Sequence, residues 1–367
     1  MGAASAIRLG MIGCGLISHA HGRAALKSGQ DIRFVSCASR TAESAMRWAQ
    51  TYRCASYYSD HREMLEKEQL DGVVISTWPS SHCELITAAL DAGVRHVLCE
   101  KALVTSVGDA LAVWHAAGRA GAVVQEAFMY RHHAAIATAR AIVEAGELGA
   151  VDWIHGDFHM FDPETADAED ASRGWRQVAA AGGGVIHDFA CYPVDAANLF
   201  AGGLPVRAFA TGSRSAKFGV INRLFAHIQY AGGCVATVSS SRRSCLRQSL
   251  RIGGSKAVLD VPFAWSAPGC QTLTKTASPG FLAEEVTQYP VACEAPHDGS
   301  LSDFPVFTRQ LCHFANVIRG VERPVLPLAA SVVNAMVLDA LRKSFEEGLP
   351  VAIDVPPDVQ NVLQSAA

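Results

Sequence analysis

Two short motifs in this sequence carry side chains that can move a proton. The first ends at Lys101, directly after an apolar, strand-like run, and the second places Asp188 and Tyr192 after the triplet Gly182–Gly184. If the second segment is helical, Asp188 and Tyr192 lie one turn apart on the same helix face. Lysine, tyrosine and aspartate together can transfer a proton to or from a hydroxyl group while a cofactor transfers the hydride. These residue types therefore predict an oxidoreductase rather than a binding module.

Tyr192 is the candidate that accepts the hydroxyl proton in oxidation and returns it in reduction. A phenol has a reference pKa of about 10, so it needs a nearby cation, which Lys101 could supply. Asp188 is expected to orient the substrate or the catalytic pair, although a helix N-terminus also favours a carboxylate there. The alternatives are a core tyrosine and an exposed lysine at a helix start. His187 is interpreted as structural.

A second signal concerns a dinucleotide. The segment Gly13-Cys14-Gly15-Leu16-Ile17-Ser18 follows an apolar run and opens a helical pattern, as a dinucleotide-binding fingerprint requires. The first glycine permits the tight turn, and Gly15 lets the backbone approach a pyrophosphate at the helix N-terminus. Ser18 replaces the usual third glycine. A glycine turn in a non-binding domain is the alternative.

The end of the next strand distinguishes the two nicotinamide cofactors. NAD sites usually place an acidic side chain there, whereas this sequence has Ser39 and Arg40. An arginine can hold a 2′-phosphate, and a nearby hydroxyl can add a hydrogen bond. The sequence therefore favours NADP over NAD. If Arg40 is only a solvated residue at a helix start, the preference stays open.

Alternating strand and helix signals predict a Rossmann-type, doubly wound parallel sheet over residues 1–126. Residues 127–367 form a second domain, in which short strands between Val206 and about Val261 predict an antiparallel sheet. The expected strands are 7–12, 32–38, 72–77, 95–99, 123–126, 151–161, 224–230, 234–239 and 249–252. The expected helices are 16–27, 41–52, 82–92, 106–120, 134–144, 304–319 and 329–347.

Composition narrows the class of protein. The 367 residues are 50% hydrophobic and 18% charged, with a net charge of −4, so nothing points to nucleic acid or an anionic membrane surface. No apolar run is long enough for a membrane helix, and no signal peptide is expected. The 11 cysteines include no C-x-x-C pair, which favours a reducing cytoplasm. His155 and His159 lie too far apart along a strand to suggest a metal site.

The order and spacing of the motifs resemble the family of glucose-fructose oxidoreductase, inositol dehydrogenase and MocA. The motifs that carry this resemblance are residues 13–18, 77–82, 100–101, 126–131, 175–176, 182–192 and 310–324. The resemblance implies a Rossmann domain followed by an α/β domain with a large open, mainly antiparallel sheet. In the family this sheet covers the nicotinamide and usually forms the subunit contact, so a homodimer or homotetramer is expected. Tyr192 matches the branch of xylose dehydrogenase, dihydrodiol dehydrogenase and ketosugar reductases.

The sequence thus predicts an NADP-dependent enzyme acting on a secondary hydroxyl or ketone of a sugar, cyclitol or related polyol. The expected catalytic residues are Lys101, Tyr192 and Asp188. The expected cofactor-binding residues are Gly13, Cys14, Gly15, Leu16, Ile17, Ser39, Arg40, Thr77, Trp78, Pro79, His82, Glu100, Lys101, Glu126, Trp175 and Arg176.

Two alternatives stay open. A nucleotide-linked ketosugar reductase would need basic groups for a diphosphate, and the candidates are Arg242, Arg243, Arg247 and Arg251. These arginines could instead be a solvated sheet edge. A non-catalytic NADP-binding regulator is the alternative of another class, but such a sensor would not need a proton-transfer set.

Overall fold

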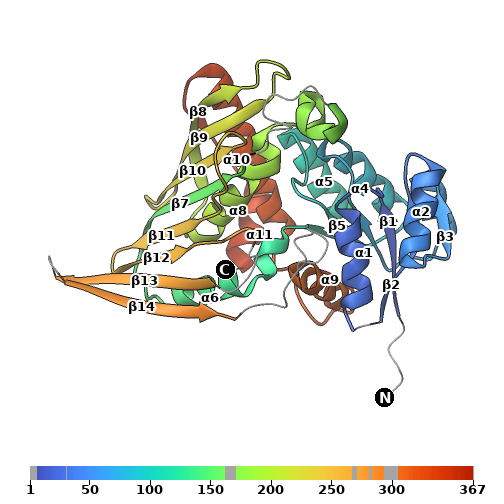
Figure 1. Ribbon diagram of the computed structural model, residues 1–367, viewed down its shortest axis with the longest axis horizontal. Helices are drawn as coiled ribbons and strands as arrows, with labels where there is room; N and C mark the ends of the chain where they lie inside the picture. The colour runs from blue at the N-terminus through green and yellow to red at the C-terminus, as the bar shows by residue number, and fades with distance from the viewer. Residues whose placement is uncertain are drawn as a thin grey trace. The chain divides into compact units, whose positions relative to one another are not determined.

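The chain forms two compact units. The computed structural model describes residues 6–29, 31–161, 171–266, 271–280, 283–292 and 305–366 (Figure 1). The first unit comprises Met1–Val104, Gly108–His132 and Ala295–Leu328, and the second comprises Thr105–Val107, His133–Glu294 and Ala329–Ala367. The sequence placed the division after residue 126. In the structure the first unit continues to His132 and also includes helix α9 (Pro305–Ile318), which contacts α1.

The first unit is built on a parallel sheet with the strand order β3-β2-β1-β4-β5-β6. Its strands are β1 (Ile7–Ile12), β2 (Ile32–Ala38), β3 (Ser56–Tyr58), β4 (Gly72–Ile75), β5 (His96–Cys99) and β6 (Val123–Glu126). Its other helices are α1 (Ser18–Lys27), α2 (Ala42–Tyr52), α3 (His61–Lys67), α4 (His82–Asp91) and α5 (Val107–Ala120). This confirms the predicted doubly wound fold, whose central strands are apolar because helices cover both faces.

The sequence did not predict β3 and α3. Strand β3 has only three residues, and only two residues of α3 are buried, so neither element has a clear hydrophobic pattern. The N-terminus of α3 is fixed instead by the Asp60 side chain, which accepts a hydrogen bond from the Arg62 backbone.

Helix α2 is anchored beside the carboxyl end of β2. Trp48 on α2 is buried and packs edge-on against Phe34 of β2, with ring centroids 5.3 Å apart. Thr41 caps the helix by accepting a hydrogen bond from the Ser44 backbone. The cap and the tryptophan together fix the turn that carries Ser39 and Arg40.

The second unit is built on a nine-stranded sheet with the order β14-β13-β12-β11-β7-β10-β9-β8-β15. Its strands are β7 (Val151–His159), β8 (Pro205–Arg214), β9 (Ile221–Tyr230), β10 (Val235–Ser241), β11 (Leu250–Gly254), β12 (Ala257–Val261), β13 (Gln271–Gly280), β14 (Ala283–Val291) and β15 (Val351–Ala352). Its α-helices are α6 (Ala134–Glu144), α8 (Cys191–Phe200), α10 (Leu328–Glu347) and α11 (Pro357–Ala366). Strands β7 and β10 are parallel to each other, and each pairs antiparallel with its other neighbour. The sheet is therefore mixed but mainly antiparallel, as predicted.

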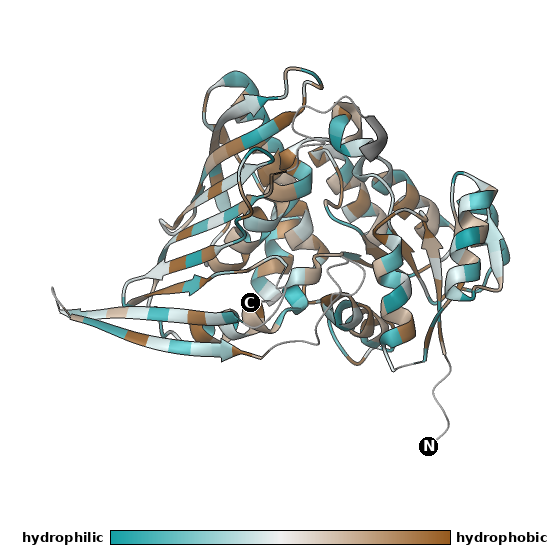
Figure 2. Cartoon of the chain, in the orientation of Figure 1, coloured by the Kyte–Doolittle hydropathy of each residue, from teal (hydrophilic) through white to brown (hydrophobic). Residues whose placement is uncertain are grey.

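The sheet extends further than the sequence suggested. The predicted strands ended near Val261, but the hairpin β13–β14 adds two strands beyond it. Most residues of β14 are exposed, so the hairpin lacks the strongly apolar face by which a strand is recognised in a sequence (Figure 2).

The two faces of this sheet differ in what lies against them. Helices α8 and α10 lie on one side of the central strands (Figure 1). On that side Gly156 of β7 leaves room for Pro193 of α8, because a Cβ at residue 156 would lie 2.6 Å from the proline Cβ. On the opposite face many side chains are polar or exposed. Along β9, for example, exposed residues on this face alternate with buried residues on the other face.

Candidate active site

The carboxyl ends of the parallel strands bring the predicted first-unit residues to one edge of the sheet. The strand order reverses between β1 and β4, and in open α/β sheets ligands bind in the crevice at such a reversal. The fingerprint loop follows β1, Arg40 follows β2, Thr77–Pro79 follow β4, and Lys101 follows β5. The sequence had predicted these segments separately, and the fold makes them neighbours.

The fingerprint loop has the conformation that its residue types require. Gly13 has a φ of 94°, and a Cβ there would lie 2.7 Å from the Thr77 methyl group, so only glycine fits. A Cβ on Gly15 would meet no atom within 4 Å, so this side of the loop is open. Ser18, in place of the third glycine, is buried and donates a hydrogen bond to the Gly15 carbonyl at 2.5 Å. Helix α1 therefore begins at Ser18 rather than at Leu16, which is exposed in the loop.

Arg40 and Trp78 form a pair at the same edge. The Arg40 guanidinium carbon lies 5.1 Å from the centre of the Trp78 ring, within the range of a cation–π contact. Arg40 is exposed, and Pro79 begins a short 3₁₀ turn directly after the tryptophan. The pair thus presents a fixed positive charge and an aromatic face beside the fingerprint loop.

His82 connects two of the loops. It is fully buried, with Nδ1 3.0 Å from the Ala102 carbonyl oxygen and Nε2 3.2 Å from the Thr77 carbonyl oxygen. Burial, which disfavours the imidazolium, lowers the pKa of His82. This histidine therefore joins the loop after β4 to the loop after β5.

Two buried carboxylates support the Lys101 segment, whose peptide bond to Ala102 is cis. Glu100 lies 2.8 Å from Nε2 of His21 and accepts a hydrogen bond from the Lys101 backbone at 3.2 Å. Glu126 accepts a hydrogen bond from the Leu103 backbone at 2.8 Å. Both residues were predicted at the cofactor site, and the structure shows their carboxylates fixing the turn that carries the lysine.

In the second unit Tyr192 lies at the first turn of α8 within a cluster of aromatic rings. It is 8% exposed, and its ring centroid lies 5.3 Å from that of Phe158 and 6.1 Å from that of Trp265. Phe158 in turn stacks on Phe189 at 4.4 Å. The phenol ring is therefore fixed by packing on several sides.

The segment before Tyr192 is helical, as the spacing of Asp188 and Tyr192 required, but it is not a regular α-helix. Residues Ile186–Ala190 form a π-helical turn, and α8 begins only at Cys191. A π turn contains an additional residue per turn and occurs frequently at functional sites. A single sequence gives no signal that separates such a turn from α-helix.

Asp188 is buried and binds two arginines. Its Oδ2 accepts a hydrogen bond from Arg176 Nε at 2.9 Å and a second one from Arg242. Arg242 is 2% exposed and also lies over the Phe189 ring at 4.3 Å. The carboxylate that was expected to orient the substrate therefore pairs with two guanidinium groups and positions them.

The glycine triplet explains how Arg176 reaches this carboxylate. A Cβ on Gly183 would lie between 2.6 and 2.8 Å from three carbonyl oxygens of the Trp175–Val178 turn. Only glycine permits this close approach, which packs the turn against the start of the π-helical segment. The Arg176 guanidinium also lies 5.1 Å from the Trp175 ring, so the two residues form one unit.

His187 behaves as the structural residue that the sequence suggested. It is buried, and its Nδ1 lies 3.2 Å from the Gly182 carbonyl oxygen. Burial lowers the pKa of His187 to about 4, so the imidazole stays neutral near pH 7.

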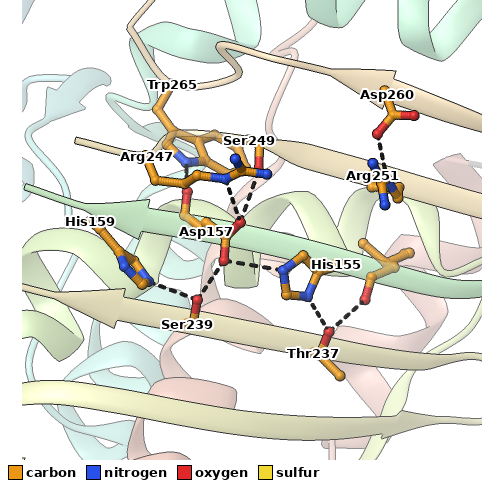
Figure 3. Close-up of polar contacts among 11 residues, drawn as sticks. His155, Asp157, His159, Thr237, Ser239, Arg247, Ser249, Arg251, Asp260 and Trp265 are labelled. Atoms are coloured by element: carbon orange, nitrogen blue, oxygen red, sulfur yellow. Dashed lines mark hydrogen bonds and ion pairs between the residues drawn. The ribbon is translucent and has the colours of Figure 1, made fainter. Parts of the chain in front are cut away.

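A polar cluster covers the face of the sheet that carries no helix (Figure 3). Asp157 of β7 lies at its centre, with its carboxylate 3.1 Å from His155 Nε2 and 2.5 Å from Ser239 Oγ. His159 contacts the same serine at 2.8 Å. Burial favours the neutral acid, but the hydrogen bonds from His155 and the serines outweigh it and lower the pKa of Asp157.

The sequence reasoning missed three of these contributions. His21 supports Glu100, Arg242 pairs with Asp188, and Asp157 organises the polar face. His21 and Arg242 act through partners that are distant in the sequence, so no local pattern indicates them. Asp157 could have been noticed as the middle residue of an alternating His-x-Asp-x-His strand.

Within the residues that the structure describes, no group of three or more histidine, cysteine, aspartate or glutamate side chains gathers in a geometry that could hold a metal ion. Among the same residues, no helix has the length and apolar character needed to cross a membrane.

The buried pair makes a testable difference to stability. Replacing Asp188 by asparagine removes the charge that compensates Arg242, so we expect the free energy of unfolding to fall by about 3–5 kcal/mol. Asp260 pairs with Arg251 at the surface, where both side chains are a third or more exposed, and D260N should cost at most about 1 kcal/mol. Urea denaturation of both variants measures the difference, and equal losses would contradict this account of Asp188.

Comparison with known proteins agrees with the geometry. Residues 7–128 match the model of an oxidoreductase family with an NAD-binding Rossmann fold, and residues 136–260 match the GFO/IDH/MocA C-terminal domain. A D-xylose 1-dehydrogenase (NADP(+)) of Haloferax volcanii is 30% identical over 81% of this chain and 85% of its own length.

Solved structures share the fold. A levoglucosan dehydrogenase in complex with NADH superimposes with a TM-score of 0.84 at 19% identity, covering 96% of this chain and 100% of that chain. A 3-ketoreductase from Actinomadura kijaniata in complex with NADP and TDP-benzene has a TM-score of 0.78 at 22% identity, covering 93% and 98%. With both domain models matched in order, the chain belongs to the GFO/IDH/MocA family of NAD(P)-binding oxidoreductases.

Proposed function

We propose that this protein transfers a hydride between NADP(H) and a secondary hydroxyl or ketone of a sugar, cyclitol or related polyol. The observation that carries the proposal is the edge of the first sheet, where the fingerprint loop, the Arg40–Trp78 pair and the Lys101 turn meet. The Haloferax relative, which is named as an NADP-dependent xylose dehydrogenase, supports both the substrate class and the cofactor.

The residues present fit a dinucleotide. The open side of Gly15 leaves room for a pyrophosphate beside the N-terminus of α1, and Arg40 can pair with a 2′-phosphate. Trp78 offers an aromatic face next to that charge. NADP(H), when bound, supplies or accepts the hydride, and the chain supplies the groups that bind the substrate and move its proton.

Tyr192 is assigned the proton transfer. Its ring is fixed among aromatic side chains, so the hydroxyl group has a defined direction. Lys101 contributes a positive charge that stabilises a developing alkoxide or phenolate. Asp188 acts as a positioning residue, because its carboxylate holds Arg176 and Arg242 near Phe189 and the turn before Tyr192.

The structure weighs against reduction of a nucleotide-linked ketosugar. Three of the four arginines that could bind a diphosphate have carboxylate partners in this chain: Arg242 with Asp188, Arg247 with Asp157, and Arg251 with Asp260. These carboxylates compete with a diphosphate for the arginines, which supports an uncharged sugar. The remaining alternative, a non-catalytic NADP-binding regulator, would bind NADPH without turning over any substrate.

We further propose a homodimer or homotetramer formed through the face of the nine-stranded sheet that carries the Asp157 cluster. Exposed apolar side chains accompany this cluster: Phe225 lies in the face, and Met160, Phe161, Leu246 and Phe263 lie where neighbouring strands end. An exposed patch of this kind beside paired charges is typical of a protein interface.

The nine cysteines in the described residues are all free thiols, which supports a reducing compartment such as the cytoplasm.

The cofactor assignment can be tested at Arg40. Replacing Arg40 by alanine should weaken NADPH binding by about 1.5–3 kcal/mol, the range of a hydrogen bond to a charged group, because the 2′-phosphate loses its partner. NADH lacks that phosphate, so its binding should hardly change. Titration calorimetry with both cofactors measures this, and an equal loss for NADPH and NADH would refute the assignment.

The reaction is tested by assaying sugars, polyols and ketosugars in both directions by NADPH absorbance, and then by two variants on an active substrate. Y192F removes only a hydroxyl group, so NADPH binding should persist while turnover falls by about 10²–10⁴-fold. K101A should also lower turnover and shift the pH optimum of the residual activity upward, because in the proposed mechanism the lysine charge favours the phenolate. The combined loss should be less than additive. Near wild-type turnover in Y192F would exclude this mechanism.

The assembly is tested by light scattering at micromolar concentration. We expect a solution mass that is a multiple of the 38.9 kDa chain. F225D should shift the protein toward the monomer, because it places a charge in the proposed interface. V321D is the matched control, since Val321 is also exposed but lies in the first unit. A monomeric wild-type protein would contradict the proposal.

A further inference from the structure

A short segment after β12 places Trp265 beside Tyr192. Trp265 is 2% exposed, and its ring centroid lies 6.1 Å from that of the tyrosine, with the two rings tilted by 44°. A Cβ at Gly156 would lie 2.6 Å from the Pro193 Cβ and 3.8 Å from Cζ2 of Trp265. The indole and the first turn of α8 therefore share the space next to this glycine.

The indole nitrogen ties Trp265 to strand β7. Its Nε1 donates a hydrogen bond to the Asp157 backbone carbonyl at 2.6 Å (Figure 3). The next residue of the strand is Phe158, whose ring also packs against Tyr192. Two rings that contact the tyrosine are thus fixed to the same strand, one through its own backbone and one through a hydrogen bond. A phenylalanine at residue 265 would have no donor for this bond.

Two buried glutamines hold the segment that carries Trp265. Gln248 accepts hydrogen bonds at Oε1 from the Ser266 backbone at 3.0 Å and from the Ser266 hydroxyl group. Gln271 accepts a hydrogen bond from the Phe263 backbone at 3.1 Å and donates one to the Phe263 carbonyl at 2.9 Å. The chain is therefore fixed directly after the tryptophan and two residues before it.

Another tryptophan of this protein is buried without such support. Trp48 in the first unit is 1% exposed, and its Nε1 has no hydrogen-bond partner among the described residues. Packing alone is thus sufficient to bury an indole here. The hydrogen bonds around Trp265 give its ring a defined direction in addition, and the ring lies against Tyr192.

We propose that Trp265 is a positioning residue for Tyr192. It restrains rotation of the phenol ring, so the hydroxyl group keeps one direction before a substrate binds. Proton transfer requires a donor and an acceptor that are close and aligned, and a ring that moves freely spends less time in that geometry. The catalytic consequence rests on the proposed function, whereas the restraint on the ring does not.

The restraint is tested by incorporating 3-fluorotyrosine into the full-length protein and recording fluorine NMR spectra. The chain has 7 tyrosines, and Y192F identifies the signal of Tyr192. W265F removes the indole hydrogen bond, so we expect this signal to change in position and width while the other tyrosine signals stay. W153F is the matched control, because Trp153 belongs to the same strand but lies next to Gly253. It should leave the Tyr192 signal in place.

The catalytic consequence is measured with NADP⁺ and D-xylose, and with the other sugars and polyols of the activity screen. W265F should lower kcat about tenfold and change KM less than about twofold, because a misdirected hydroxyl group weakens the transition state rather than substrate binding. In the Y192F background W265F should cost little more, since Trp265 acts through the phenol. A tryptophan that only stabilised the fold or contacted the substrate would have the same effect in both backgrounds.

The outcomes separate this role from the proposed function. An unchanged Tyr192 signal in W265F, or an equal loss of turnover in the two backgrounds, would overturn the role of Trp265. If W265F does not fold, Q271M tests the same restraint, because it removes both hydrogen bonds to Phe263 and should also move the Tyr192 signal. Near wild-type turnover in Y192F would refute the proton transfer, and the fluorine signal would still show whether Trp265 restrains the ring.

Discussion

The arrangement of the site depends on buried carboxylates that must be compensated. A charge removed from water is tolerated only where a cation or several hydrogen bonds replace its hydration. Glu100 and Asp188 meet this requirement, and Glu126 accepts a backbone hydrogen bond, each at a turn that carries a predicted functional residue. Their partners come from distant parts of the chain, so each carboxylate joins segments that backbone hydrogen bonds alone would not hold. The turns of the site are thereby fixed before any ligand binds.

The parallel sheet contributes a second constraint. Because its strands run in one direction, their carboxyl ends share one edge, and the loops that follow them become neighbours whatever their distance in the sequence. His82 strengthens this arrangement by binding carbonyl groups of two such loops. The topology of the sheet thus places the fingerprint and the Arg40–Trp78 pair at the same edge, and side-chain contacts fix their conformation.

The two faces of the mixed sheet in the second unit carry different clusters of side chains, one aromatic and one polar. The helix-covered face fixes Tyr192 through Phe158 of β7, one residue away from Asp157, which points to the opposite face. A strand alternates its side chains, so a single β7 connects the aromatic cluster with the polar cluster. Changes at the outer face would therefore reach the tyrosine through one strand. The proposed interface and the proposed proton-transfer residue therefore contact opposite faces of the same strand.

Local sequence patterns determined the elements and the residue types of the site. Strands 7–12, 32–38 and 123–126 and helix 134–144 agree with the structure to the residue, because apolar periodicity and capping act over short distances. The same short-range patterns predicted the fingerprint, Arg40, Lys101 and Tyr192. Only the tertiary structure showed the π-helical turn at Ile186–Ala190, the pairing of Asp188 with Arg242 and the support of Glu100 by His21. These features depend on which distant side chain compensates a buried charge, and a single chain read in order contains no local signal of that partner.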